Sequence, residues 1–507
     1  MTQPTTARHS GGSSTDRGFL GHPGGLGTLF FVELWERFSY YGMRAILVYY
    51  LYTAIADGGL GIPEENAQAV VAIYGASVYL LSVIGGFAAD RMIGAYRSTL
   101  YGGMVIMAGH ISLALPAEVA SWTGIALVAL GTGLLKPNIS TMVGQLYDED
   151  DKRRDGGFSI FYMSINIGAF FSPFIVAELR NLWGFHAGFA AAAVGMALAL
   201  VLFVWGRGRL SPHSFEVPNP LTSRERTTVS VGILAALAAF VVVYFLAAMW
   251  RDSATEQVVD AISIFCLLTP VAFFTMMFRS PKVSATERSH LTAYIPLWIG
   301  AMLFWMIFEQ AAGKMATFAE VNTDLSLGAL EVRPEWFQSI NPLAIIALAP
   351  IFAIVWTRRA GRFPSLPMKF AIGVALIGLS AFAMSAAYAA YPPDGPARAA
   401  VWVLGSIFVL QTIAELCLSP VGLSATTLLA PKAFASQAMA LWFLGSAAGQ
   451  ALAAQIITAM AGLSDAVYYA ALGGMTLAVA LLLFLLVPWT QRKIEAADTG
   501  ETVAAAH

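Results

Sequence analysis

Long apolar segments alternate with short polar loops along almost the whole chain. Fourteen such segments can be counted, and most contain few or no charged side chains. About 20 apolar residues in a helix cross the roughly 30 Å hydrocarbon core of a membrane. The pattern therefore predicts a polytopic helical membrane protein. The predicted spans are 24–53, 67–90, 98–116, 121–146, 158–179, 186–205, 228–249, 257–278, 290–318, 336–356, 367–391, 399–427, 434–461 and 465–488.

Composition excludes the main soluble classes. Of the 507 residues, 57% are hydrophobic and 12% are charged, and the formal net charge is −2. A soluble domain has about 25% charged residues, and a nucleic-acid-binding protein needs a basic surface. The two cysteines, Cys266 and Cys417, lie in apolar segments, so neither a disulfide framework nor a Cys-rich metal site is expected. No apolar stretch precedes Gly18, so no cleavable signal peptide is expected.

The basic residues predict the orientation of the chain. With the N-terminus inside, 21 Lys and Arg residues fall in the inner segments and 4 in the outer loops. An excess of Lys and Arg marks the cytoplasmic side of a membrane protein. We therefore expect a multi-pass protein of the cell (inner) membrane with both termini in the cytoplasm.

The loop after the second span resembles the loop signature of the major facilitator superfamily, in Gly86, Asp90, Arg91, Gly94 and Arg97. Its carboxylate and arginines could lock two helices together. The alternative is a plain helix-end turn. The superfamily has two six-helix bundles, so two of the fourteen spans are extra. The best candidates, 228–249 and 257–278, have few polar residues and are expected to face lipid. The predicted division is a disordered tail 1–23, a bundle 24–206, a linker with the extra helices 207–283, a second bundle 284–489 and a disordered tail 490–507.

The first span carries a set of polar side chains that is unusual for a membrane helix. A charged residue at the centre of a bilayer costs at least about 2.5–3.5 kcal/mol, so each one is a functional candidate. Spacings of 0, 3, 4, 7, 8 and 11 residues place the set on one helical face. A buried ion-pair seam is the alternative, but apolar packing would be more stable there. We interpret the face as part of a polar pathway. It consists of Glu33, Glu36, Arg37, Tyr40, Tyr41 and Arg44.

Four further charges lie within spans. Counting residues from the predicted span ends places Lys136 and Glu415 near the midplane and Glu309 nearer the outer mouth, level with Arg44. We therefore predict two salt bridges between the halves, Lys136–Glu415 at the site and Arg44–Glu309 at an outer gate. The remaining charge, Lys314, is given no role beyond snorkelling towards the outer surface. Proline kinks beside a cavity are expected at Pro137, Pro173, Pro342 and Pro420.

Three stretches resemble the proton-dependent oligopeptide transporter (POT) family in its prokaryotic form. ELWERFSYYG in the first span is similar to the family motif ExxERFxYYG. FSIFYMSINIGAFFSP in the fifth span and FWMIFEQ in the next half are similar to two further signatures. One departure is that no histidine occurs between Asn66 and Arg91, where mammalian members place one on the second span.

The resemblance implies roles for particular residues. Glu33, Glu36 and Arg37 match the proton-coupling motif, and Glu309, with Arg44 as partner, matches a further proton site. Lys136 and Glu415 match the residues that bind the carboxylate and the ammonium of a peptide, respectively. The other implied contacts and pocket-wall positions are Tyr40, Tyr41, Tyr79, Asn166, Trp305, Asn341, Trp442 and Ser446.

The implied function is proton-coupled import of di- and tripeptides by alternating access. A site that reads any short peptide needs a cation, an anion and amide groups, which Arg37 with Lys136, Glu415, and Asn166 with Asn341 would supply. The alternative is a carrier of the same fold for an amino acid, nitrate or a peptide-like drug. No HExxH, GxSxG or P-loop sequence occurs, so neither an enzyme nor an ATP-driven pump is expected. No cofactor, metal or nucleic acid is implied, and the protein is expected to act as a monomer in the bilayer.

Overall fold

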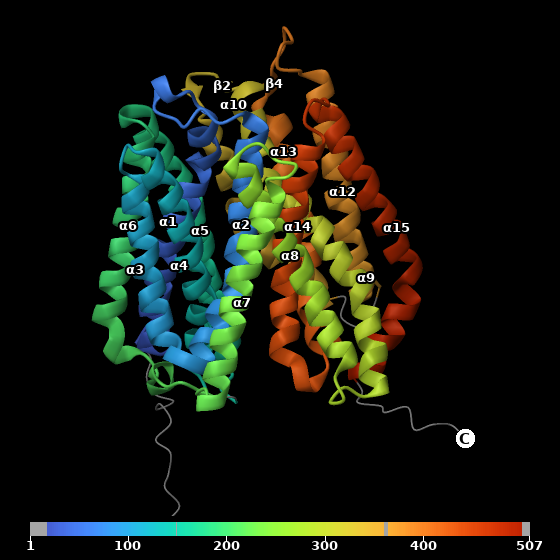
Figure 1. Ribbon diagram of the computed structural model, residues 1–507. Helices are drawn as coiled ribbons and strands as arrows, with labels where there is room; N and C mark the ends of the chain where they lie inside the picture. The colour runs from blue at the N-terminus through green and yellow to red at the C-terminus, as the bar shows by residue number, and fades with distance from the viewer. Residues whose placement is uncertain (1–17, 149, 359–362, 499–507) are drawn as a thin grey trace, which may run out of the picture.

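The computed structural model describes residues 18–148, 150–358 and 363–498, which are almost entirely helical. The long helices run side by side, and their ends gather at two faces (Figure 1). Both ends of the described chain lie near the lower face in Figure 1, which we call the terminal face. The upper face is called the distal face.

The first bundle contains six long helices, α1 to α6. Small residues let neighbouring helices pack closely, as where α3 crosses α4: a Cβ atom at Gly102 would lie 2.7 Å from the carbonyl oxygen of Gly131. Such close contact is a common basis of helix association in membranes. The helices are α1 (Gly24–Tyr52), α2 (Glu64–Ala88), α3 (Ala95–Leu113), α4 (Glu118–Gly144), α5 (Arg154–Trp183) and α6 (Phe185–Trp205).

The second bundle also contains six spans, but its first span is broken. The sequence predicts one continuous helix over 290–318, whereas the structure has α9 and α10 separated by a 3₁₀ turn, Glu309–Ala312, and by Gly313. The break places Glu309 at the end of a helix. The helices are α9 (Ala285–Phe308), α10 (Lys314–Val321), α11 (Ile340–Arg358), α12 (Leu366–Ala390), α13 (Val401–Leu429), α14 (Ala435–Ala459) and α15 (Asp465–Asp498).

Short elements complete the chain. Two-residue strands lie at the distal face, where β1 (Thr323–Asp324) pairs with β4 (Ala399–Ala400), and β2 (Ser326–Leu327) pairs with β3 (Leu330–Glu331). Besides the turn at Glu309, 3₁₀ turns occupy Ile55–Asp57, Gly206–Arg209, Pro212–Phe215, Pro334–Ser339 and Lys432–Phe434.

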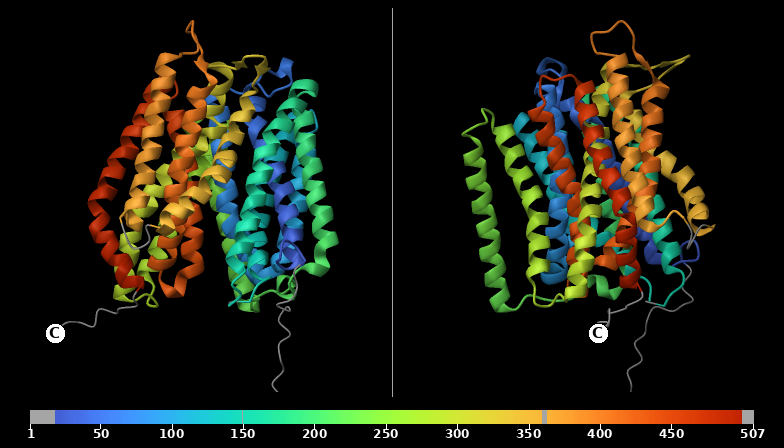
Figure 2. Two further views of the ribbon diagram at one scale, coloured as in Figure 1. Left: turned by 180° about the vertical axis from the view of Figure 1, so that it is seen from behind. Right: turned by 90° about the vertical axis from the view of Figure 1, so that its right-hand side faces the viewer.

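Two helices, α7 (Ser223–Ala247) and α8 (Ala254–Arg279), form a hairpin between the bundles in the sequence. Both were expected to face lipid. This is correct for α7, which is almost entirely exposed and stands at the periphery in Figure 2. It is only partly correct for α8, which exposes Leu268 and Val271 but also packs against α2 of the first bundle and α14 of the second. The reason is Asp260, whose buried carboxylate accepts hydrogen bonds from Arg251 in the hairpin and from Gln455 on α14.

The predicted fold class, two six-helix bundles with two inserted helices, is confirmed. Within the described ranges, twelve segments are long and apolar enough to cross a membrane by length and composition, with α9 and α10 counted as one. Two bundle helices, α1 and α3, are outside this count although they run alongside the others (Figure 1). Helix α1 fails the composition test because it carries Glu33, Glu36, Arg37 and Arg44.

Two local expectations need correction. Residues 490–498 were expected to be disordered, but α15 continues to Asp498, since Ile494 is buried and Lys493 Nζ donates to Ser289 Oγ over 2.7 Å. In the tail predicted over 1–23, residues Phe19 and His22 form a β-bridge. The parts of both predicted tails at 1–17 and 499–507 lie outside the described residues.

Candidate functional site

The charged residues of α1 form a buried cluster. Arg37 Nε lies 3.0 Å from Glu33 Oε1 and forms a second ion pair with Glu36. All three side chains are buried. Helix α5 covers them closely, since a Cβ atom at Gly168 would overlap the carbonyl oxygen of Leu34. Within the described part of the chain, Arg37 Nη2 and Glu36 Oε1 have no hydrogen-bond partner, so the cluster has unused capacity for a further polar group or a proton.

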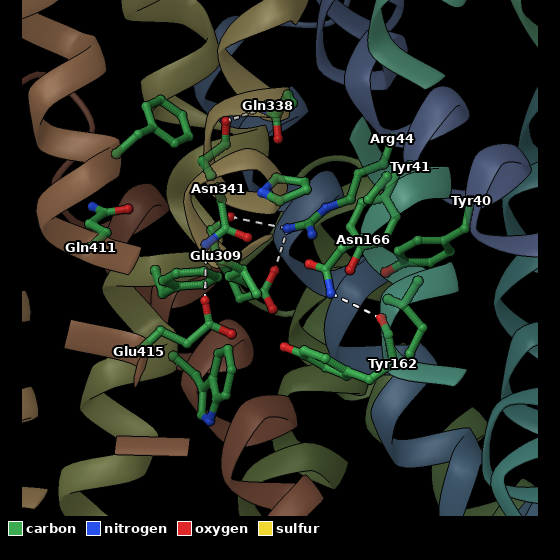
Figure 3. Close-up of a pocket in the computed structure, with 18 of the residues that line it drawn as sticks. Tyr40, Tyr41, Arg44, Tyr162, Asn166, Glu309, Gln338, Asn341, Gln411 and Glu415 are labelled. Carbon is green, nitrogen blue, oxygen red and sulfur yellow. Dashed lines mark hydrogen bonds and ion pairs between the residues drawn. The ribbon is translucent and has the colours of Figure 1, made fainter. Parts of the chain in front are cut away.

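A cavity of about 200 Å³ lies between the two bundles. Figure 3 shows side chains of both bundles pointing towards one another there. Its cations, Arg44 and Lys136, come from the first bundle, and its anions, Glu309 and Glu415, come from the second. The cavity therefore has a basic wall and an acidic wall. The uncharged polar and aromatic side chains of the lining that were predicted are Tyr40, Tyr41, Tyr79, Asn166, Trp305 and Asn341.

One predicted salt bridge is formed. The Arg44 guanidinium pairs with the carboxylate of Glu309, and its Nη2 atom also lies 3.4 Å from the carbonyl oxygen of Glu309. This pair joins α1 to the break between α9 and α10 (Figure 3). Both side chains are largely buried, with exposed fractions of 12% and 9%.

The other predicted bridge, Lys136–Glu415, is not formed, and this prediction was wrong for this conformation. The Lys136 ammonium lies 3.8 Å from the centre of the Tyr79 ring, in its own bundle. Glu415 Oε2 instead accepts a hydrogen bond from Asn341 Nδ2 over 2.9 Å, also within its own bundle. The physical reason is that the bundles make no polar contact with each other at this level among the described residues.

All hydrogen bonds and ion pairs that join the two bundles between described residues lie in the distal half. Besides Arg44–Glu309 they include Tyr49 O–H donating to the carbonyl oxygen of Ala316 over 3.0 Å and Gln68 Nε2 donating to Thr317 Oγ1 over 3.1 Å. The structure is therefore locked by polar contacts at the distal face. The other joined residues are Tyr52 with Glu320, Arg180 with Glu320 and Glu335, Arg333 with Glu178, and Ser339 with Phe170.

The two predicted amide side chains of the cavity are oriented by hydrogen bonds within their own bundles. Asn166 Nδ2 donates to the carbonyl oxygen of Tyr162 over 3.0 Å. Asn341 Nδ2 donates to both Thr412 Oγ1, over 3.0 Å, and Glu415. Each amide is thus held by its own bundle while it lines the cavity between the two.

Some predicted residues lie elsewhere. Trp442 and Ser446 do not belong to the cavity wall. Trp442 is buried and its ring packs directly against Gly422, so closely that a Cβ atom there would overlap the ring. Ser446 Oγ accepts a hydrogen bond from Gln450 Nε2 over 3.2 Å. Lys314 does not snorkel: it is buried and pairs with Asp465 at the start of α15.

The loop signature and the prolines also differ from expectation. Residues Ala89–Ile93 form a π-helical turn that extends α2, and Gly94, with φ of 82°, ends it. Arg91 pairs with Glu225 over 2.9 Å, and Asp90 forms no ion pair with any described residue, so the expected lock is not made by Asp90. Pro137, Pro173 and Pro420 lie inside helices as predicted, whereas Pro342 is in the first turn of α11, where it breaks no helix.

Sequence reasoning missed several lining residues, among them Tyr162, Gln338 and Gln411. Helical spacing could have found them. Tyr162 and Gln411 precede Asn166 and Glu415 by four residues on the same helices, and Gln338 precedes Asn341 by three. Residues at these spacings share a helical face with the predicted site residue.

Comparison with known proteins identifies the family. Residues 96–471 match the family model described as PTR2, POT family. The chain belongs to the POT family. It is therefore a membrane transporter of the major facilitator fold and not an enzyme.

Relatives match over nearly their full length. The uncharacterised transporter YclF of Bacillus subtilis is 44% identical over 95% of this chain and 97% of the relative. A di-/tripeptide transporter of Lactococcus lactis subsp. cremoris is 41% identical over 94% of this chain and 97% of the relative. A crystal structure of a peptide transporter POT variant with sulfate is 45% identical, covers 94% of this chain and 97% of its own, and has a TM-score of 0.88.

Proposed function

We propose that the protein imports di- and tripeptides, driven by protons. The observation that carries this proposal is the separation of charge across the cavity, with Lys136 on one bundle and Glu415 on the other. A short peptide is a zwitterion whose end charges are constant while its side chains vary. The carboxylate would bind Lys136, the ammonium would bind Glu415, and the backbone would bind Asn166 and Asn341. Arg37, which was also predicted to bind the carboxylate, is buried with Glu33 and Glu36 and does not line the cavity. The names of the relatives support this substrate class.

The same arrangement supports alternating access. In the described conformation each central charge is held within its own bundle, so a peptide that bridges Lys136 and Glu415 draws the bundles together. We propose that the bundles 24–206 and 284–489 rock as units about this site, with 207–283 as the inserted linker.

The Arg44–Glu309 pair is the proposed coupling element. When the distal face opens, Glu309 loses Arg44 and binds a proton, which removes an unpaired charge from the membrane interior. When the face closes, Arg44 returns and displaces the proton towards the terminal face. Glu33 and Glu36 balance the charge of Arg37 throughout.

The proton gradient supplies the free energy in this proposal, and no cofactor takes part. One proton that moves through 100 mV supplies about 2.3 kcal/mol, and each pH unit adds about 1.4 kcal/mol. For this direction of transport the terminal face is cytoplasmic and the distal face external, with the protein in the inner membrane. The proposed working unit is a monomer.

The test uses proteoliposomes and a labelled dipeptide. Glu309→Gln is expected to keep counterflow exchange and to lose accumulation driven by a pH gradient, because glutamine carries no exchangeable charge. Glu331→Gln, which alters a largely exposed carboxylate, is the control and is expected to behave as the wild type. Accumulation by Glu309→Gln would refute the proton assignment, and absence of dipeptide counterflow in the wild type would refute the substrate class.

One observation favours a second candidate substrate. A POT family transporter that is 38% identical, with a TM-score of 0.88, was crystallised with 5-aminolevulinic acid, a small molecule with a carboxylate and an amine. The same pair of charges would suit the two walls of this cavity. If 5-aminolevulinic acid were to compete with labelled dipeptide at lower concentration than unlabelled dipeptide, the small amino acid would be the preferred cargo.

A further inference from the structure

A second ionic cluster joins the bundles at the distal face. Arg180 of α5 forms ion pairs with Glu320 of α10 and with Glu335 in the 3₁₀ turn that precedes α11. The distance from Arg180 Nη2 to Glu320 Oε1 is 3.1 Å. The cation belongs to the first bundle and both carboxylates belong to the second, so opening the distal face must separate them.

The guanidinium is fixed in the first bundle by two aromatic rings. Its central carbon lies 4.7 Å from the ring centre of Tyr49 and 4.6 Å from that of Phe185. A cation over aromatic rings in a largely buried place is held strongly. Arg180 therefore moves with the first bundle when the distal face opens and does not follow the carboxylates.

The cluster has an excess negative charge. Two carboxylates share one guanidinium, and the other groups that face them do not compensate. Tyr52 O–H donates to Glu320 and Tyr49 is uncharged. Arg333 lies 3.2 Å from Glu178 and 3.6 Å from Glu331, so its charge is already used. When the bundles separate, two carboxylates would remain without a cation.

Exposure decides which carboxylate a proton can reach. The side chain of Glu335 is 2% exposed, whereas that of Glu320 is 29% exposed and lies towards the distal solvent. A proton that binds Glu320 changes the charge of the cluster from −1 to 0 and leaves Arg180 paired with Glu335. The neutral carboxyl group no longer attracts Arg180, so less work is needed to open the distal face.

We propose that Arg180, Glu320 and Glu335 form a second proton-binding site, loaded from the distal face and separate from Glu309. The site senses the acidity of the distal solvent and favours opening when that solvent is acidic. The proton enters and leaves on the same side, so it adds nothing to the number of protons carried with each peptide. This inference rests on the proposed function, because that proposal places the distal face outside the cell.

The test measures opening without transport. Spin labels are placed at Leu182→Cys and Trp402→Cys, two exposed distal positions on different bundles. The distance between them, measured by pulsed electron paramagnetic resonance, gives the ratio of open to closed molecules. Both native cysteines are buried, and the chain without the introduced cysteines is the labelling control. One linked proton changes the ratio at most about tenfold per pH unit, and two change it at most about a hundredfold.

The decisive comparison is made in the Glu309→Gln background. There we expect the ratio still to change by up to about tenfold per pH unit, with opening at low pH. Adding Glu320→Gln should weaken the dependence on pH, because only Glu335 is then left without a cation when the distal face opens, whereas adding Glu331→Gln, the matched exposed acid, should leave the dependence in place. Glu335→Gln is the second variant, to be used if Glu320→Gln does not fold, and it should likewise weaken the dependence, because one carboxylate of the pair that loses Arg180 on opening is removed.

Three outcomes would overturn the inference. These are a pH-independent ratio in Glu309→Gln alone, an unchanged dependence in Glu309→Gln with Glu320→Gln, or an altered proton-to-peptide ratio in Glu320→Gln. Failure of the proposed function is distinguishable, because it is absence of proton-driven dipeptide uptake by the wild type, whereas the distance measurement needs no cargo.

Discussion

Charged side chains pair differently in the distal half of the bundle interface and around Lys136 and Glu415 in the central cavity. In the distal half, which includes the part of the cavity wall formed by Arg44 and Glu309, charged groups pair across the interface, as these two do and as Arg180 does with Glu320. In the cavity, Lys136 is held by the Tyr79 ring and Glu415 by Asn341, each within one bundle. The distal charges therefore lock a conformation, whereas the central charges remain available to a cargo.

This difference teaches how one set of buried charges can serve two purposes. A charge that is already paired across the interface has little free energy left for a ligand. A charge that is only oriented, by a ring face or a single amide, can still pair with an ion of opposite sign. We infer that conformational control and substrate recognition are separated by depth in this protein, and the following variants test that separation.

The largest effect is expected for Lys136→Ala. Removing one member of a buried charge pair costs about 2–5 kcal/mol, so proton-driven dipeptide uptake should fall by about thirtyfold or more. The distal label distance should stay as in the wild type, because Lys136 makes no bond across the interface. Lys432→Ala, at an exposed lysine, is the control for loss of a positive charge. Distal opening in Lys136→Ala would show that the two regions are not separate.

A smaller effect is expected for Asn341→Ala, which removes the donor that orients Glu415. Hydrogen bonds to charged groups contribute about 1.5–3 kcal/mol, so the concentration of dipeptide for half-maximal uptake should rise by about tenfold to a hundredfold. A peptide whose amine is acetylated lacks the ammonium that Glu415 would bind, and its weak competition should not change.

The control for Asn341→Ala is Thr412→Val. It removes the other acceptor of Asn341 Nδ2 but leaves the bond to Glu415 in place. An equal loss in both variants would mean that Asn341 acts by packing and that Glu415 does not depend on it.

Much of the fold could be predicted because the membrane imposes a simple rule. Apolar runs of span length must be helices, and the inserted pair stood out by its position between two sets of six. The rule has no means of detecting one buried carboxylate, so it placed α8 in lipid although Asp260 ties it to Gln455 of α14. It also missed the break at Gly313, because the length of the run suits one long helix and the polar residues beside the break, Glu309, Gln310 and Lys314, were interpreted as charges and polar groups within a span.

The sequence predicted which residues belong to the site better than it predicted which of them pair with each other. Helical spacing and depth placed Arg44 beside Glu309, since both lie at the same level on facing spans. The same argument failed for Lys136 and Glu415. The depth of two residues does not show whether the bundles that carry them are in contact at that level. The distal residues Arg180, Glu320 and Glu335 lie near span ends, where charges are common, so the sequence alone gives no reason to select them.

The smallest effect is expected for Thr317→Val, which removes one uncharged bond from the distal set. Gln68 Nε2 donates to Thr317 Oγ1 over 3.1 Å, and both side chains are buried. A neutral hydrogen bond contributes about 1 kcal/mol net, so the open-to-closed ratio at the distal face should rise by about fivefold. The same spin labels at positions 182 and 402 measure it. The matched control is Thr132→Val on α4, a buried threonine whose hydroxyl has no partner within the described residues. If both variants shift the ratio equally, the distal face is closed by packing rather than by its polar bonds. If only Thr317→Val does so, even an uncharged member of the distal set contributes to the lock.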